Sequence, residues 1–402
     1  MRSSRWETRM TVVIVGLLAG CTPAATPQTV ARAIAARPTT TTATVDTGAT
    51  TTEAVPEFNL SGATPRWERA IADLYGPACG GNRRSLPAEL SGLPTALRCP
   101  TRGNATTTSM GEVELAVATI GPDAVYGVDD GSGFRIVAAR LPSLSSPETT
   151  IAWYGVVPKV IVAVGSDARP GEDPTRARAD SIHLVALDGL GLGGLIGIPR
   201  DSWVRIAGGR SSKINASLST GGPEVMLQTV ADVTGLNLDG YVLTGFNGFQ
   251  EMIGNVLGGV DIELPAPVSD SAAGANLDSG LQYLNGPQAL ALARARKSLT
   301  GGDLARQHNG GLLLLAALAS VRAYGPLHLP TLISESAPWM NTDLTPAELL
   351  AFSALALDTP LAGIGNHVAP GRVGTAGSAS VVYLSESAPA LFADLADGNL
   401  TP

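Results

Sequence analysis

The sequence predicts an α/β fold, in which helices cover a central sheet, preceded by a small α+β region. The first observation is the continuous apolar run from Val160 to Val164, which is typical of a central strand buried on both faces. The second is the alternation of strand-like and helix-like segments after this run, which indicates an α/β domain. The third is the mixture of short helical and strand patterns before residue 150.

The small region is expected at residues 58–150. A short helix is predicted because four apolar side chains share one face at helical spacing: Trp67, Ile71, Leu74 and Tyr75. Residues 113–117 alternate between apolar and other side chains, as in a half-buried strand, and residues 134–141 are predicted to form another strand. Nothing here suggests chemistry, so the region either extends the following sheet or binds a partner.

The larger domain is expected at residues 158–390. Strands are predicted at 160–164, 181–187, 194–198 and 260–264. Helices are predicted at 222–233, 246–257, 286–296 and 304–323, and two of them open on a Gly-Pro pair that suits a first helical turn.

One glycine-rich segment resembles a nucleotide-binding loop. Gly189–Gly194 has the glycine spacing of a dinucleotide-binding loop and follows a strand. Such a loop must lead directly into a helix whose N-terminus faces the pyrophosphate, whereas residues 195–198 are predicted to form another strand. We therefore interpret Gly189–Gly194 as a hairpin turn.

The N-terminus has the features of an export signal, predicted at residues 1–21. Three arginines, at positions 2, 5 and 9, precede a short apolar stretch. The stretch ends in Leu18-Ala19-Gly20-Cys21, which resembles a lipoprotein cleavage box and predicts that Cys21 is lipidated and anchors the protein to the membrane. The alternative is a plain secretory signal. Residues 22–57, rich in Ala, Thr and Pro, are expected to form a tether.

The remaining cysteines, Cys79 and Cys99, form an even pair in an exported protein, which favours one disulfide over two free thiols. A zinc site is poorly supported, because the four histidines are scattered along the sequence.

Composition argues against one class of partner. The chain has 402 residues, a net charge of −8 and only 15% charged residues, so a broad basic face for nucleic acid is not expected. The sequence also lacks the motifs of serine hydrolases, zinc proteases and P-loop enzymes.

Arginines and aspartates recur at the predicted strand and helix ends. They are Asp167, Arg169, Arg178, Asp180, Arg200, Asp201, Arg294, Arg296, Asp303 and Arg306. Ligands of open α/β sheets bind outside the carboxyl ends of the strands, so several of these groups can converge. The arginine fork matches phosphate oxygens, and two aspartates can hold Mg²⁺ together with substrate phosphates. For each pair taken alone, a surface ion pair is the alternative.

Eight short motifs, in order along the chain, resemble the LytR-CpsA-Psr family. They are Gly165–Arg169, Arg178–Ser181, Ile198–Ser202, Lys213–Ala216, Gly221–Glu224, Leu257–Asp261, Leu284–Leu290 and Arg294–Arg296. The resemblance covers about residues 159–323. It implies a three-layer α/β/α domain with a central mixed sheet.

The resemblance also implies an extracytoplasmic phosphotransferase of the bacterial cell envelope. Members of the family move a glycopolymer from a polyprenyl diphosphate carrier to peptidoglycan, with Mg²⁺ as cofactor. Carried over to this chain, Asp167 and Asp180 would hold Mg²⁺. The phosphate-binding arginines would be Arg169, Arg178, Arg200, Arg294, Arg296 and Arg306. Arg178, Arg200 and Asp201 would be catalytic, with Asp201 as the candidate acceptor of the hydroxyl proton.

The helices that follow Gly222, Phe246 and Leu304 would wall a slot for the polyprenyl chain, although ordinary core packing also explains their apolar residues. One departure from the family pattern stands out. Members usually follow their last arginine with a further Arg-Gln-Gln, whereas here Arg306-Gln307-His308 runs into Asn309-Gly310-Gly311. Two alternatives to transfer therefore stay open: binding of polyprenyl diphosphate or wall glycan without turnover, and hydrolysis of the prenyl diphosphate.

Overall fold

The structure is a computed structural model of the chain, which divides into two units, Met1–Thr52 and Glu53–Pro402. It describes residues 59–82, 86–87, 90, 99, 102–144, 151–297, 299 and 301–400. The predicted signal (1–21), the lipidation site Cys21 and the tether (22–57) lie outside the described residues.

The small region forms its own six-stranded sheet, which we call the accessory sheet. Its strands follow the order β1 (Asn59–Ser61), β2 (Arg102–Met110), β3 (Val113–Ile120), β4 (Asp123–Asp129), β5 (Arg135–Arg140) and β6 (Ala152–Trp153). Strands β1 and β2 are parallel and the later pairs antiparallel. The sheet thus continues past residue 150, and no described strand of it pairs with the central sheet, so it does not extend that sheet.

Helix α1 (Pro65–Tyr75) packs on one face of the accessory sheet. It begins where the Thr64 side chain caps the Trp67 N–H, and its predicted apolar face is buried. The strands bury alternate residues on their two faces: Ala116 and Val125 lie toward α1, and Leu115 and Val117 lie on the opposite face. Both faces of this sheet are therefore covered.

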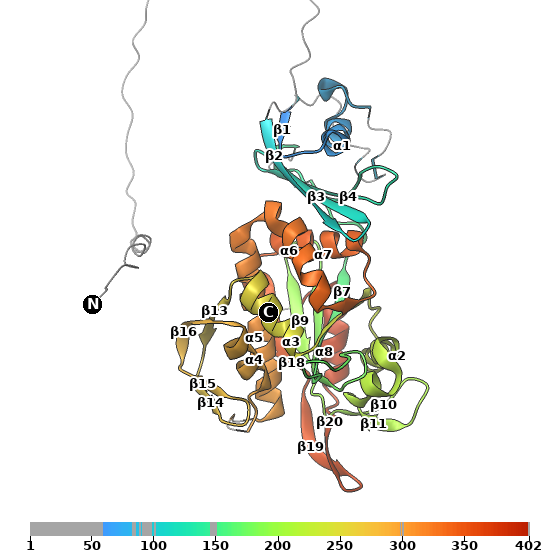
Figure 1. Ribbon diagram of the computed structural model, residues 1–402. Coiled ribbons are helices and arrows are strands. Elements are labelled where there is room, and N and C mark those ends of the chain that lie inside the picture. The colour runs from blue at the N-terminus through green and yellow to red at the C-terminus, as the bar shows by residue number, and fades with distance from the viewer. Residues whose placement is uncertain are drawn as a thin grey trace, which may run out of the picture. The chain divides into compact units, whose positions relative to one another are not determined.

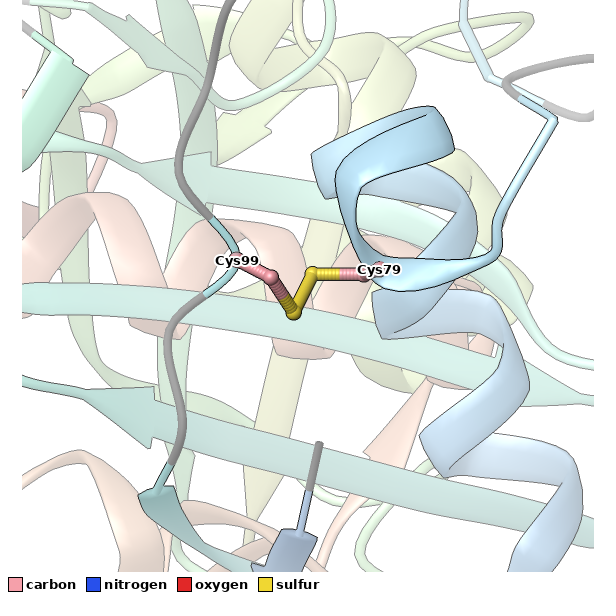
Figure 2. Close-up of a disulfide and its surroundings, with 2 residues drawn as sticks. All are labelled: Cys79 and Cys99. Atoms are coloured by element: carbon pink, nitrogen blue, oxygen red, sulfur yellow. A yellow bond between two sulfur atoms is a disulfide. The ribbon is translucent and has the colours of Figure 1, made fainter. Parts of the chain in front are cut away.

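A disulfide joins Cys79, at the end of the 3-10 helix Gly76–Cys79, to Cys99 (Figure 2). It ties the chain just after α1 to a point shortly before β2.

The central sheet is mixed, as the family resemblance implies. Its order is β17 (Asn341–Thr342), β12 (Gly240–Thr244), β7 (Lys159–Ser166), β8 (Ala179–Leu187), β9 (Gly193–Gly197) and β18 (Ile364–Val368). Strand β7 is parallel to β12 and antiparallel to β8. The segment between β8 and β9 is the predicted hairpin turn, in which the Asp188 carboxylate accepts the N–H groups of Leu190 and Leu192.

Helices cover both faces of this sheet (Figure 1). On one face, α2 (Ala216–Thr234) and α8 (Ala388–Asp394) pack against Val160, Val162 and Val164 of β7. The other face carries α3 (Phe246–Glu251), continued by the π-helix η4 (Met252–Val256), and α4 (Gly286–Arg294), α5 (Asp303–Tyr324), α6 (Leu329–Ser336) and α7 (Pro346–Asp358). The result is the three-layer α/β/α arrangement.

The domain also contains smaller elements outside the central sheet. The paired strands are β10 (Trp203–Arg205) with β11 (Ser211–Lys213), β13 (Val260–Leu264) with β16 (Gly280–Leu284), β14 (Val268–Asp270) with β15 (Ala275–Leu277), and β19 (Gly371–Ala376) with β20 (Ala379–Leu384). Further 3-10 helices in the described part of the chain are Pro142–Leu144, Pro326–His328, Ala337–Trp339, Leu361–Gly363 and Leu395–Asp397. The predicted strand at 260–264 exists as β13 but pairs outside the central sheet.

Two helical predictions need correction at their ends. Helix α2 begins at Ala216 and passes through a kink at Gly222, whose φ of 78° suits glycine, instead of starting there. Helix α4 ends at Arg294. Within the described ranges, no single helix has the length and apolar composition to cross a membrane; only Asp303–Tyr324 and Pro326–Trp339 taken together meet that criterion, and they are bent by 100°.

Candidate functional site

The ends of β7 and β8 bring two predicted carboxylates to one place. Ser166, the last residue of β7, pairs with Ala179, the first of β8. Just beyond, the Asp167 N–H donates to the Arg178 carbonyl at 2.9 Å, and the Arg178 N–H donates to Asp167 Oδ1 at 2.8 Å. Because Asp180 follows Ala179 directly, Asp167 and Asp180 lie at the same end of the sheet.

Four charged side chains form the centre of the site, and we call them the charged cluster: Asp180, Arg200, Asp303 and Arg306. Arg200 follows β9 and makes an ion pair with Asp180. Its Nε lies 4.0 Å from Asp303 Oδ1. Asp303, at the start of α5, is 2.5 Å from Nη2 of Arg306, one turn later on the same helix. The cluster therefore joins β8, the segment after β9, and α5.

The charged cluster is shielded from solvent. The side chains of Asp303 and Arg306 are only 12% and 5% exposed. Burial raises the pKa of Asp303 against the opposing effect of Arg306 and Arg200, and burial lowers the pKa of Arg306. For Arg200, burial alone would lower the pKa, but Asp180, Asp201 and Asp303 raise it above its usual value. Each shielded arginine of the cluster is therefore compensated by an aspartate of the cluster, and each aspartate by an arginine.

The other predicted residues surround this cluster at different depths. Asp201 Oδ1 lies 2.8 Å from Lys213 Nζ. Arg294 stacks over the Phe246 ring at 4.7 Å, and Arg296 is close enough to Asp303 to oppose the rise in its pKa. Arg169 is exposed, and its N–H donates to Glu172. Arg178 is also exposed, so these two arginines lie at the rim and not in the cluster.

An apolar slot of about 360 Å³ begins at the charged cluster. Its charged end includes Asp180, Arg294 and Arg306. The rest of the wall is mostly apolar. The central sheet and α4 contribute to it, and most of it comes from α3, η4, α5, α6 and α7, including Phe246, Phe249, Met252, Ile253, Leu257, Leu313, Leu314, Ala317, Val321, Leu329, Leu332, Ile333, Met340 and Leu349.

One predicted wall is wrong. Helix α2, which contains Gly222, contributes no residue to the slot, because it packs on the opposite face of the central sheet with Met226 and Val230 in that core. Helices α6 and α7 take part instead. The predicted contributions of the helices after Phe246 and Leu304 are present.

A buried histidine, unassigned by the sequence analysis, lines the slot beside the cluster. His183 Nε2 lies 2.9 Å from the Gln307 carbonyl and Nδ1 lies 3.1 Å from Ser181 Oγ. Since a carbonyl only accepts, Nε2 carries the proton and Nδ1 accepts from the Ser181 hydroxyl. Burial lowers the pKa of His183 to about 4, so the ring is neutral at pH 7.

The glycines of Asn309-Gly310-Gly311 leave room for neighbouring side chains. A Cβ at Gly310 would lie 2.6 Å from His183 Cε1, and one at Gly311 would lie 2.0 Å from Asn366 Oδ1. The space next to this segment of α5 is thus filled by His183 and Asn366. Sequence reasoning also left Asp303 without a role, although its i, i+3 spacing to Arg306 on a helix is a usable signal.

The residues fit Mg²⁺ only in partnership with a phosphate. Within the described part of the chain, no three His, Cys, Asp or Glu side chains are grouped to hold a metal ion. Asp167 and Asp180 nevertheless offer hard oxygen ligands at one end of the sheet, and Mg²⁺ is commonly held by one or two carboxylates plus substrate phosphates.

Comparison with known proteins now decides the family. The model of the LytR_cpsA_psr family matches residues 152–392, more than half of the chain. The chain belongs to the LytR-CpsA-Psr family. This confirms the resemblance that the eight motifs carry.

Two proteins with similar sequences have names that refer to the cell wall or to peptidoglycan. The probable cell wall biosynthesis protein LcpB of Corynebacterium glutamicum is 34% identical over 179 residues, covering 42% of this chain and 43% of LcpB. The polyisoprenyl-teichoic acid–peptidoglycan teichoic acid transferase TagV of Bacillus subtilis is 34% identical over 152 residues, covering 36% of this chain and 39% of TagV. The chain thus spans about half or less of the length of these relatives.

The solved structures agree on the fold. The crystal structure of Bacillus subtilis TagV superposes with a TM-score of 0.51 at 27% identity, covering 61% of this chain and 98% of that chain. Protein gbs0355 of Streptococcus agalactiae superposes with a TM-score of 0.54 at 22% identity, covering 61% and 89%. Both support the α/β fold of the LytR-CpsA-Psr domain.

Proposed function

We propose that this protein transfers a glycopolymer from a polyprenyl diphosphate carrier to peptidoglycan, as a phosphotransferase with Mg²⁺ as cofactor. The observation that carries the proposal is the apolar slot that ends at buried arginines and aspartates. A long apolar chain joined to a diphosphate has the same two-part chemistry. A relative, TagV, is named as a transferase of teichoic acid from polyisoprenyl-teichoic acid to peptidoglycan, which supports an apolar carrier chain.

In this proposal the arginines, the aspartates and the slot have different tasks. Arg200, Arg294, Arg296 and Arg306 bind the diphosphate oxygens, and Arg169 and Arg178 attract the substrate at the rim. Asp167 and Asp180 would hold Mg²⁺, which neutralises phosphate charge when bound. The slot holds the prenyl chain and excludes water from the charged end.

The reaction balances as a transfer of one phosphoryl group. A hydroxyl of peptidoglycan attacks the phosphorus that bears the glycopolymer, and the bond from this phosphorus to the bridging oxygen breaks. Prenyl phosphate leaves, and a phosphodiester joins the glycopolymer to the acceptor. Asp201 is the predicted acceptor of the hydroxyl proton, and Arg178 and Arg200 stabilise the developing charge.

The proposal places the protein outside the cytoplasm, in the bacterial cell envelope. A lipid on Cys21 would hold it at the membrane surface, where a polyprenyl carrier is found, and residues 22–57 would let it reach the wall. Nucleic acid is not an expected partner.

The test incubates the purified protein with geranylgeranyl diphosphate, with and without Mg²⁺, and measures released phosphate and prenyl monophosphate. Wild type should react only with Mg²⁺, and Arg200→Ala and Asp180→Ala should abolish turnover. Arg205→Ala is the matched control, since Arg205 is exposed on β10 and makes no ion pair with the cluster. Absence of turnover in wild type, or equal turnover in all variants, would contradict catalysis at this site.

A second candidate function is binding without transfer. It is favoured by the departure from the family's further Arg-Gln-Gln, since here Arg306-Gln307-His308 runs into Asn309-Gly310-Gly311, and by His183, which fills the space next to Gly310. Wild type that binds geranylgeranyl diphosphate but releases no product would support this candidate. Product release that is not followed by transfer to peptidoglycan, when a lipid-linked glycopolymer is supplied, would instead indicate a pyrophosphatase.

A further inference from the structure

The slot and the accessory sheet share a wall. Leu329 and Ile333 of α6 and Leu349 of α7 line the slot, and the same three side chains belong to the buried cluster that joins these helices to Leu115 and Val117 of the accessory sheet. Their exposures are 1%, 7% and 8%. These three side chains therefore lie between the slot and the accessory sheet.

This shared wall lies at the far end of the slot. Helix α5 lines the slot from Arg306 to Val321, which spans about 22 Å at a rise of 1.5 Å per residue. Helix α6 begins at Leu329, soon after α5 ends at Tyr324. Leu329 thus lies toward the end of the slot opposite Arg306 and the charged cluster.

The opposite side of α6 is fastened to the accessory sheet by two polar contacts. Thr331 Oγ1 lies 3.2 Å from Thr108 Oγ1, and Ser334 Oγ donates to the Ser109 carbonyl at 2.7 Å. Neither Thr331 nor Ser334 lines the slot. Figure 1 shows α6 and α7 next to β3 of this sheet, in agreement with their packing.

An eight-residue helix such as α6 has little stability of its own, so its position comes from the surfaces on which it packs. Close-packed side chains transmit such placement, because they leave few voids to absorb a shift. We infer that the accessory sheet fixes α6 and thereby determines how well the slot holds the far part of a long prenyl chain. The inference rests on the proposed function, and it gives residues 59–153 a role in lipid-length specificity.

The test compares two equivalent truncations in neighbouring strands. Val117→Ala removes two methyl groups from the face toward α6 and α7, and Val125→Ala removes the same groups from the face toward α1. Both side chains are 0% exposed, so similar losses of stability are expected. Binding of geranyl diphosphate, which reaches only the charged end, is compared with binding of geranylgeranyl diphosphate, whose chain is twice as long.

Val117→Ala should weaken geranylgeranyl diphosphate binding by roughly threefold to tenfold and leave geranyl diphosphate nearly unchanged, and Val125→Ala should change neither. Ser334→Ala should act in the same direction as Val117→Ala. In wild type, geranylgeranyl diphosphate should also slow hydrogen exchange in β2 and β3 more than geranyl diphosphate does, because coupling between sites is reciprocal.

Equal effects of the two valine variants, or equal losses for the two lipids, would overturn this inference and leave the proposed function standing. If wild type binds neither lipid, the proposed function fails, and this inference fails with it. The two failures are therefore distinguishable in one set of titrations.

Discussion

The Asp303–Arg306 pair allows a quantitative test of the buried charges. In Asp303→Asn, the Arg306 guanidinium loses its carboxylate partner, which lies 2.5 Å away, and stays 5% exposed. Removing one partner of a buried ion pair usually costs about 3–5 kcal/mol. We expect about 3 kcal/mol, the lower end, because the slot beside Arg306, about 360 Å³ in volume, has room for water when no prenyl chain fills it. Arg200 contributes little to the loss, since it keeps its ion pair with Asp180.

The free energy of unfolding is measured by urea denaturation, followed by tryptophan fluorescence. Asp303→Asn should lower the midpoint at an unchanged m-value. Asp232→Asn, on the exposed side of α2, is the control and should stay within about 0.5 kcal/mol of wild type. Inorganic pyrophosphate should restore more stability to Asp303→Asn than it adds to wild type, because the anion supplies the missing charge.

A double variant separates charge burial from simple packing. Asp303→Leu combined with Arg306→Met replaces the pair by apolar side chains and should recover most of the lost stability. The explanation fails if Asp303→Asn costs less than about 1 kcal/mol, or if the double variant is as unstable as the single one.

Four further outcomes are expected. Because the unfolded state takes up the His183 proton first as the pH falls, the wild-type free energy of unfolding should fall by roughly 3 kcal/mol between pH 6.5 and about 4; urea titrations at several pH values should show this slope reduced in His183→Gln. Gly310→Ala should lower the melting temperature, because its Cβ would lie 2.6 Å from His183 Cε1. A second change, His183→Ala, should relieve this effect. Equal melting curves for wild type and Gly310→Ala would disprove the contact. Replacing Cys79 and Cys99 by serine should destabilise the accessory sheet by about 3 kcal/mol, measured by its hydrogen exchange, and unchanged exchange would argue against a stabilising disulfide. Isothermal titration should show that Mg²⁺ tightens pyrophosphate binding in wild type but not in Asp180→Asn; the same enhancement in both would exclude Asp180 as a ligand.

The sequence predicted the parts of the site that depend on local order along the chain. Strand β7 was recognisable from its apolar run, and the polar residues that follow it had to lie at the sheet end. The turn at Gly189–Gly194 was predictable for the same reason, because the next residues have strand character. Short-range patterns of this kind need no knowledge of the rest of the fold.

The slot wall was not predictable in the same way. An apolar helix face looks alike whichever face of a sheet it covers, so the sequence could not show that α2 packs away from the slot. Helices α6 and α7 follow the last recognisable motif, and their apolar residues suit a core as well as a lipid wall. Only the folded arrangement of the chain shows that Leu332 of α6 and Leu349 of α7 line the slot.

The charges of the site suggest how a diphosphate enters it. The charged cluster contains two arginines and two aspartates, so it is neutral overall and does not attract an anion by net charge. A phosphate oxygen that binds Arg200 Nη1 would take the place of the Asp180 carboxylate, because the carboxylate contacts that same nitrogen. The displaced carboxylate would then be a half-buried anion without its cation, and the proposed Mg²⁺, shared with the phosphate, would compensate it. Exchange of partners keeps every shielded charge compensated, so the proposed cofactor and the diphosphate should bind cooperatively, whereas either alone would leave Arg200 paired with Asp180.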